Sequence, residues 1–211
     1  MRTRITFLDF KNALNTFSIF STVDIYKAFP NLHRRRLHEW VARGLLKPVV
    51  KRYYVFSDVF IDESFLYFVA NRIYDPSYIS LQSALSRYGL IPEFVPQVTS
   101  VSTKKTTSLS TEFGSFSYFS LKESLMFGYD LVFSKDQKYK IKIAFPEKAI
   151  LDLLYLNPNI DSMEEFSELR LNTEVYREKV KPDVITHYLE LFSSKILTKR
   201  VNSLMEYMNN A

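Results

Sequence analysis

Near the start of the chain, hydrophobic residues recur at helical spacing in three short runs and then give way to an extended pattern. The runs predict helices over residues 3–15, 20–30 and 31–43. Residues 45–56 are rich in Val, Tyr and Phe and predict a β-ribbon. Three short helices followed by a ribbon is the element order of a winged helix-turn-helix, so the pattern indicates that fold for residues 1–57.

Residues that favour helix ends support this division. Ser21 or Thr22 can cap the start of the second helix, and Pro30 ends it because its ring cannot continue a helix. Gly44 follows the third helix and suits a left-handed C-cap. The pattern therefore predicts separate helices joined by tight connections.

The third helix is predicted to be apolar on one side and basic on the other. At 100° per residue, Leu37, Trp40 and Val41 share a face, so we expect them to pack inward. The remaining surface carries a basic group: Arg34, Arg35, Arg36 and His38. Arginine can grip guanine edges or phosphates with two parallel hydrogen bonds, as a recognition helix must. His33 and His38 are five residues apart, the wrong spacing for a metal pair on one helix face.

Basic residues are concentrated in this part of the chain. Residues 1–57 contain eleven Lys and Arg against three Asp and Glu, whereas the whole chain has a net charge of only +5. This asymmetry favours a polyanionic partner, although a basic face can also be merely solvated. We predict that double-stranded DNA is contacted by eight residues: Thr22, Arg34, Arg35, Arg36, His38, Lys47, Lys51 and Arg52. The three in the ribbon are expected to follow phosphates and to set affinity rather than sequence choice.

The remainder of the chain is predicted to be a mixture of helices and strands. A linker helix is expected within residues 58–77 and a second helix over residues 81–89. Short alternating runs between residues 95 and 143 predict strands of an antiparallel sheet. Further helices are predicted at residues 146–155 and 161–170 and across 182–208. The fold class is therefore α+β, with a winged helix-turn-helix over 1–57, a linker over 58–77 and an α+β domain over 78–211.

The polar segment Thr103–Ser108 is expected to be an exposed strand or hairpin tip, which leaves open a second nucleic-acid contact. The apolar residues of 184–208 either close the core or form a face for a protein partner, and the sequence leaves both possibilities open.

The residue types argue against catalysis. There is no cysteine, and the four glycines are too dispersed for a phosphate-binding loop. Glu147 and Asp152 are five residues apart on one helix and do not share a face, and His187 is isolated. We predict that the protein is not an enzyme and needs no cofactor or metal.

No segment reaches the roughly eighteen uninterrupted apolar residues that a membrane-spanning helix requires. The first residues also lack the apolar core of a secretion signal. We therefore expect a cytoplasmic protein without a membrane partner.

Two segments carry a family resemblance. Residues 78–92, Tyr-Ile-Ser-Leu-Gln-Ser-Ala-Leu-Ser-Arg-Tyr-Gly-Leu-Ile-Pro, are followed about fifty residues later by residues 143–155, Ile-Ala-Phe-Pro-Glu-Lys-Ala-Ile-Leu-Asp-Leu-Leu-Tyr. Together, and placed behind a predicted winged helix, they resemble the AbiEi family of antitoxins and transcriptional regulators. Six residues stand out within these segments: Ser80, Ser83, Gly89, Glu147, Lys148 and Asp152. We expect them to hold the second domain together rather than to contact a ligand.

The resemblance implies a repressor that binds inverted repeats in its own promoter, in two or more copies. It also implies a C-terminal domain that counters a nucleotidyltransferase toxin without a stable complex, as in a type IV toxin-antitoxin system linked to abortive infection by phage. Two alternatives remain: a transcriptional regulator without an antitoxin role, and a protein-interaction module that keeps the winged-helix shape. DNA binding that weakens steeply with salt would distinguish the repressor from the interaction module.

Overall fold

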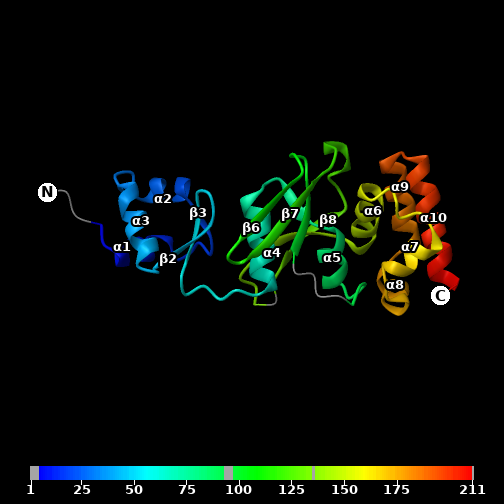
Figure 1. The fold of residues 1–211 in the computed structure, drawn as a ribbon, viewed down its shortest axis with the longest axis horizontal. Coiled ribbons are helices and arrows are strands. Elements are labelled where there is room, and N and C mark those ends of the chain that lie inside the picture. The colour runs from blue at the N-terminus through cyan, green and yellow to red at the C-terminus, as the bar shows by residue number, and fades with distance from the viewer. Residues whose placement is uncertain (1–4, 93–96, 135, 211) are drawn as a thin grey trace. The chain divides into compact units, whose positions relative to one another are not determined.

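The computed structural model describes residues 5–92, 97–134 and 136–210. Arg2, Arg4 and Val95, which contributed to the predicted basic surface and to the predicted start of the strands, lie outside these ranges. The chain folds into two compact units (Figure 1): Met1–Asp62 with Thr111–Phe113, and Glu63–Ser110 with Gly114–Ala211. Both helices and strands are present, which confirms the mixed α+β class.

The first unit contains the three predicted helices and the predicted ribbon. Its elements are α1 (Phe7–Leu14), β1 (Phe20–Ser21), α2 (Thr22–Ala28), α3 (Arg34–Ala42), β2 (Leu46–Val50) and β3 (Tyr53–Phe56). Ser21 caps α2, as predicted, and exchanges hydrogen bonds with Asp24. Gly44 has a φ of 67°, which confirms the left-handed conformation expected behind α3. The short strand β1 was not predicted; it pairs with β3, so that the described strands form an antiparallel sheet of order β1-β3-β2.

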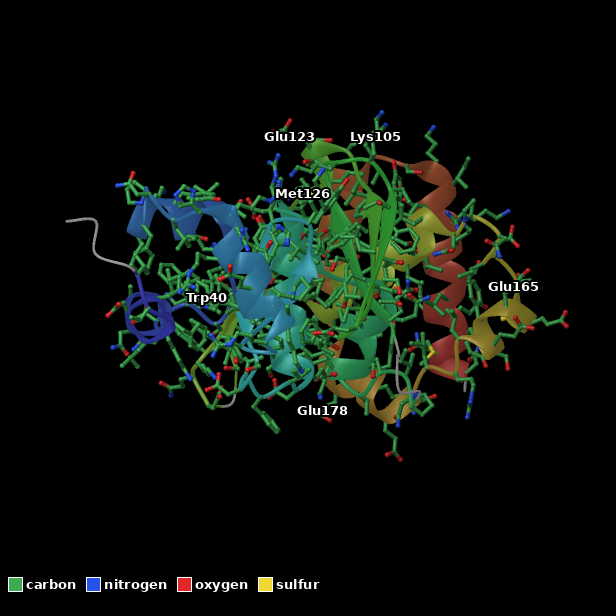
Figure 2. All side chains as sticks on the ribbon, turned by 60° about the vertical axis from the view of Figure 1, so that its left-hand side comes forward. Trp40, Lys105, Glu123, Met126, Glu165 and Glu178 are labelled. Carbon is green, nitrogen blue, oxygen red and sulfur yellow. The ribbon has the colours of Figure 1, made fainter. Side chains whose placement is uncertain are left out.

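An aromatic core holds this unit together. Trp40 of α3, labelled in Figure 2, is fully buried, as expected. The centre of its ring lies 4.6 Å from the centre of the Phe10 ring in α1. The other buried members of the cluster are Leu14, Phe20, Ile25, Leu32, Leu37, Leu46 and Phe56. Because these residues come from all three helices and from the sheet, the core fixes the orientation of α3 relative to its neighbours.

The second unit begins with α4 (Glu63–Ile73), which packs on the central strands of a larger sheet. The elements that follow are β4 (Ser77–Ile79), α5 (Leu81–Arg87), β5 (Gln97–Ser102), β6 (Thr107–Thr111), β7 (Gly114–Ser120), a 3₁₀ turn η1 (Glu123–Leu125), β8 (Tyr129–Phe133), β9 (Lys140–Ala144), α6 (Pro146–Leu156), α7 (Met163–Glu168), α8 (Thr173–Lys179), α9 (Pro182–Phe192) and α10 (Lys195–Asn210). The sequence predicted α4 to α7 and a helical stretch that contains α9 and α10. It did not predict the break between those two helices at Ser193, and it missed β4 and α8.

The larger sheet is mixed, so the prediction of an antiparallel sheet was wrong. Over the described residues its strand order is β6-β7-β5-β4-β9-β8. The pairs β4-β5 and β8-β9 are antiparallel, whereas β5-β7 and β4-β9 are parallel. Alternation of apolar and polar residues specifies which face of a strand is buried but not which strand lies beside it. The pairing directions are set by the crossovers, which the pattern did not reveal.

The connection between β5 and β6 is exposed, and Lys105 projects from it (Figure 2). This agrees with the predicted exposure of Thr103–Ser108. β6 lies at the sheet edge beside β7 and not beside β5, so the segment is not a hairpin tip. Its last two residues, Thr107 and Ser108, belong to this edge strand, which agrees with the other alternative, an exposed strand.

Helices cover both faces of the larger sheet. The Tyr118 hydroxyl of β7 donates to the Ala70 carbonyl of α4, whereas the Tyr78 hydroxyl of β4 donates to Asp152 of α6. The pairing register places Tyr118, Ser100 and Ile79 in one row across β7, β5 and β4, so their side chains lie on the same face, and successive residues of a strand point to opposite faces. Tyr78 therefore points away from α4, and α4 and α6 lie on opposite faces.

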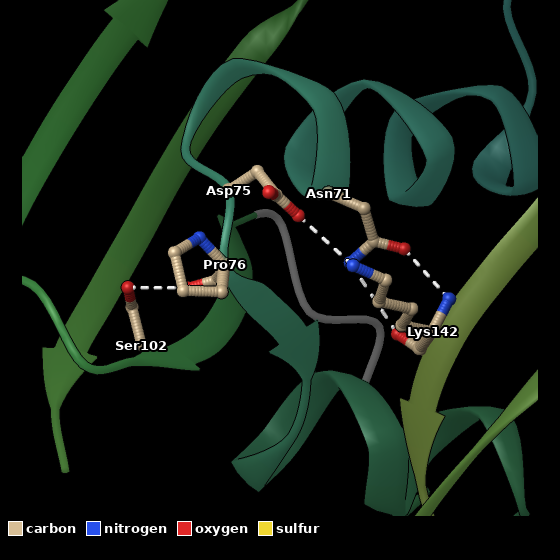
Figure 3. Close-up of polar contacts among 5 residues, drawn as sticks. All are labelled: Asn71, Asp75, Pro76, Ser102 and Lys142. Carbon is tan, nitrogen blue, oxygen red and sulfur yellow. Dashed lines mark hydrogen bonds and ion pairs between the residues drawn. The ribbon is translucent and has the colours of Figure 1, made fainter. Parts of the chain in front are cut away.

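Asn71 of α4 extends the hydrogen bonding of β9 where β4 does not reach. Its side-chain oxygen accepts from the Lys142 N–H at 2.7 Å, and its side-chain nitrogen donates to the Lys142 carbonyl at 3.4 Å (Figure 3). The Lys142 ammonium also pairs with Asp75 at 2.9 Å. Asn71 therefore satisfies the two backbone groups that a neighbouring strand would otherwise bind.

No helix in the described part of the chain is both long enough and apolar enough to cross a membrane.

Candidate nucleic-acid interface

Helix α3 has one anchored and one exposed side. Leu37 and Trp40 are buried in the core of the first unit. On the other side Arg34, Arg35 and His38 are exposed, and 88% of the Arg35 side chain is accessible. Among the described residues, Arg34 and His38 have no ion-pair partner. The helix therefore presents two guanidinium groups, of Arg34 and Arg35, and the imidazole of His38 from a backbone that the core holds in place.

Arg36 occupies a different environment from its two neighbours. Only 23% of its side chain is exposed. Its guanidinium donates to Glu39 at 3.0 Å and to the Ile5 carbonyl at 3.2 Å, and lies 5.2 Å from the Trp40 ring centre. These contacts hold α3 against the start of α1. The sequence pattern grouped Arg36 with Arg34 and Arg35, but the structure gives it internal partners.

Glu39 also reaches the exposed face. Its second oxygen pairs with Arg35 at 3.3 Å, one helical turn away. An exposed pair of this kind contributes little to stability, so Arg35 can exchange Glu39 for another anion at small cost. The i,i+3 and i,i+4 spacings of Glu39 from the two arginines were a signal that could have predicted both contacts.

The ribbon presents its basic residues at a short tip. Lys51 and Arg52 form the turn between β2 and β3, and both are exposed, whereas Lys47 is half-buried on β2. The Arg52 backbone has a φ of 74°, a conformation that favours glycine. The Arg52 carbonyl accepts a hydrogen bond of 2.8 Å from the Thr22 N–H at the start of α2. Thr22, Lys51 and Arg52 are thus brought together, as a shared surface requires.

Helix α2 adds residues that the sequence did not single out. Val23, Tyr26 and Lys27 line an open, shallow depression together with Thr22. Val23 and Tyr26 are exposed although both are apolar or aromatic. Buried Ile25 between them indicates an amphipathic helix, and that pattern could have identified the outward face of α2.

The residues of the family resemblance lie inside the second unit. Lys148 and Asp152 of α6 form an ion pair in which both side chains are fully buried. Tyr78 and Ser80 donate to the second carboxylate oxygen at 2.9 and 2.8 Å. We call these four residues the Lys148 cluster. The i,i+4 spacing of Lys148 and Asp152 is a signal in the sequence that could have predicted this pair, whereas the i,i+5 spacing of Glu147 and Asp152 places those two on different faces.

Aromatic rings enclose the Lys148 ammonium. It lies 5.0 to 5.4 Å from the ring centres of Tyr78, Phe127 and Phe192. Burial lowers the pKa of Lys148, and the Asp152 carboxylate opposes that shift. Burial likewise raises the pKa of Asp152, opposed first by Lys148. The cluster joins β4 and the start of α5 to α6, and Phe192 of α9 lies against its ammonium. Its charged groups are closed off from solvent, so it offers no group to an external substrate.

The other three residues also make internal contacts or shape the backbone. Ser83 and Thr99 exchange hydrogen bonds that join α5 to β5. Glu147 accepts from the Lys181 N–H at 2.9 Å, directly before α9. Gly89 ends α5 with a φ of 73°. All of these positions support the packing of the second unit.

Within residues 5–92, 97–134 and 136–210, no group of three or more His, Asp or Glu side chains is arranged to hold a metal ion.

Comparisons with known proteins place the chain in no family. No family model matches it, and no curated protein matches it. Among solved structures, it is similar to the RV2827C protein from Mycobacterium tuberculosis, with 13% sequence identity and a TM-score of 0.46. That similarity covers 93% of this chain and 83% of the other.

Proposed function

We propose that this protein is a DNA-binding transcriptional autorepressor whose first unit is a winged helix-turn-helix. In this proposal α3 is the recognition helix and the β2-β3 hairpin is the wing. The observation that carries it is the exposed group Arg34, Arg35 and His38 on a helix whose opposite side is fixed by Leu37 and Trp40. Arginine forks presented from a rigid helix can bind base edges and phosphates in the major groove.

The net charge of residues 1–57 and the cations at the tip of the β2-β3 hairpin support the same proposal. Residues 1–57 carry a net charge of +8, whereas the rest of the chain carries −3. Lys51 and Arg52 place two cations at the hairpin tip, beside Thr22 at the start of α2. A polyanion would meet both groups of cations on this unit.

We further propose, on the resemblance to the AbiEi family, that the protein acts in the cytoplasm as the antitoxin of a type IV system. Its operator would be an inverted repeat in its own promoter, bound by two or more copies. The second unit would counter a nucleotidyltransferase toxin without a stable complex. No catalytic step, metal or cofactor is assigned to this chain.

The test of DNA binding uses the full chain and its own upstream DNA over a series of salt concentrations. For wild type, log K should fall linearly with log salt, because each neutralised phosphate releases about 0.9 counterion. The double variant Arg34→Ala and Arg35→Ala should reduce that slope by about two and weaken binding. Lys195→Ala with Lys199→Ala is the matched control, since it removes the same charge from exposed positions of the second unit.

Arg36→Ala separates the roles of the three arginines. Because Arg36 contacts Glu39, Ile5 and Trp40, its loss should lower the stability of the first unit and leave the salt slope unchanged. Weak binding by wild type that does not depend on salt would reject the repressor proposal in favour of a protein-interaction module.

The antitoxin role has a separate test. A nucleotidyltransferase encoded beside this gene should arrest growth when it is expressed alone, and co-expression of this protein should restore growth. The double variant Arg34→Ala and Arg35→Ala should restore growth equally well. If growth stays arrested when the wild-type protein is co-expressed, the antitoxin proposal is wrong, and the protein is a regulator without an antitoxin role.

A further inference from the structure

Strand β8 lies at an edge of the larger sheet with one row of backbone groups facing outward. Among the described strands it pairs with β9 alone. The Ser134 N–H bonds the Tyr139 carbonyl, and the Phe145 N–H bonds the Gly128 carbonyl, at 2.8 and 2.9 Å. In an antiparallel ladder, hydrogen-bonded and non-hydrogen-bonded residue pairs alternate. The backbone N–H and C=O groups of the even-numbered residues of β8 therefore point toward β9. The N–H and C=O groups of the odd-numbered residues therefore face the open side.

The same odd-numbered residues carry exposed apolar side chains. Tyr129, Leu131 and Phe133 lie on one face of the strand, and 46% of Leu131 and 54% of Phe133 are accessible. Proteins usually protect such an edge with charged residues, proline or a covering segment. An edge whose outward backbone positions all carry apolar side chains is suited to pairing with another strand.

We propose that β8 pairs with β8 of a second copy of this chain, antiparallel and centred on Leu131. In that register the outward backbone groups of Leu131 meet their own equivalents, and those of Tyr129 meet those of Phe133. The apolar side chains then lie opposite one another on one face, as Tyr129 with Phe133 and Leu131 with Leu131. On the other face Asp130 lies opposite Val132, so no like charges are directly opposed.

This self-complementarity identifies a second copy as the partner. A two-fold axis through Leu131 brings identical surfaces together, which is the arrangement of an isologous dimer. A contact limited to five residues a side is small, so the dimer is weak and forms at high protein concentration.

Asp130 restrains this pairing. Its carboxylate accepts a hydrogen bond of 2.7 Å from the Leu131 N–H, one of the groups that the second strand needs. Pairing must release that contact. Removing the carboxylate should therefore strengthen the dimer, a result that a non-specific apolar contact does not predict.

The test is sedimentation velocity of the full chain over a wide range of protein concentration. Wild type should dimerise reversibly. Leu131→Lys places two ammonium groups opposite each other at the axis, so it should raise the dissociation constant of the dimer by tenfold or more, which is about 1.4 kcal/mol or more. Leu191→Lys on α9 is the matched control, because that leucine is 47% exposed and lies elsewhere. It should dimerise like wild type.

Asp130→Ala should dimerise more tightly than wild type. Equal melting temperatures for the two lysine variants would show that both fold. If the wild-type protein stays monomeric at every concentration, the proposal is overturned, and a second copy of this chain is not the partner of β8. A dimer equally sensitive to both lysine substitutions, or insensitive to both, would overturn it as well. None of these outcomes depends on DNA binding, so the repressor proposal stands or falls separately.

Discussion

Replacing Lys148 by methionine should destabilise the second unit strongly. Methionine approximates the length of the lysine stem, so the change removes the charge while largely keeping the packing against Tyr78, Phe127 and Phe192. Asp152 is then left as a fully buried carboxylate without its cation. The serine and tyrosine hydroxyls still donate to it, but hydroxyl groups do not neutralise a charge.

The expected loss is about 3–5 kcal/mol, the range for a buried ion pair that loses one partner. This is a large part of the roughly 5–15 kcal/mol that stabilises a typical domain. The double variant Lys148→Met with Asp152→Asn removes both charges and keeps an acceptor for Ser80 and Tyr78. It should therefore recover much of the lost stability, and the two substitutions should be strongly non-additive.

The single variant should also acquire a dependence on pH. Burial raises the pKa of the Asp152 carboxyl, and without Lys148 nothing cationic opposes that shift. The folded state then binds the proton more tightly than the unfolded state, so stability falls as the pH rises above the ordinary carboxyl range. The slope is at most about 1.4 kcal/mol per pH unit for one proton, and it ends above the folded pKa. The double variant lacks the carboxylate and should not show this slope.

Urea unfolding followed by far-ultraviolet circular dichroism, at several pH values, measures these changes. Trp40 is the only tryptophan and lies in the first unit, so its fluorescence checks that this unit remains folded. If Lys148→Met unfolds within about 1 kcal/mol of wild type at neutral pH, or if the double variant is as unstable as the single one, the reasoning from a paired buried charge is refuted.

Three further substitutions test other parts of the structure. Arg52→Gly should leave the first unit as stable or up to about 1 kcal/mol more stable, because glycine accepts a positive φ, but it should lower the salt slope of DNA binding by about 0.9; an unchanged slope would remove Arg52 from the interface. Asn71→Ala should cost about 2–4 kcal/mol in urea unfolding, since the Lys142 N–H and C=O lose their partner; a cost below about 0.5 kcal/mol would mean that water replaces the amide. Gly128→Ala should cost about 2–4 kcal/mol, because the added Cβ would lie 3.0 Å from atoms of both Lys148 and Tyr188, whereas Gly44→Ala, with a similar φ and no neighbour within 4 Å, should cost only about 1 kcal/mol; similar melting temperatures would contradict this steric argument.

The first unit was largely predictable because its signals are local. Ser21 caps α2 and Gly44 ends α3 through contacts with residues a few positions away, and both are legible in the sequence. The inward side of α3 follows from the spacing of Leu37 and Trp40. Strand β1 was missed because two residues carry no periodicity, and it exists only because β3 lies beside it.

The second unit was less predictable because long-range pairing determines it. Strand β4 has three residues, all buried, and no alternation to distinguish it from the start of a helix. Its parallel partner β9 lies more than sixty positions further along the chain. The direction of such a pair depends on the path of the chain between the strands, which local patterns do not contain.

The candidate site shows the same division. Exposure of Arg34 and Arg35 followed from helical geometry, but the internal role of Arg36 depends on Ile5 and Trp40, which meet it only in the folded core. The resemblance identified Ser80 and Asp152 as notable, and only the fold shows that they bind each other across seventy-two positions.

The hydrogen bond from Thr22 to the Arg52 carbonyl ties the hairpin tip to the start of α2, and β1 holds β3 from the same side. Under the proposed function, the tip cannot swing to follow grooves of different width, so the DNA must adapt to the spacing that the protein imposes. Operators that differ only in base pairs that no side chain touches would then be bound with different affinities, according to how easily each one bends or narrows.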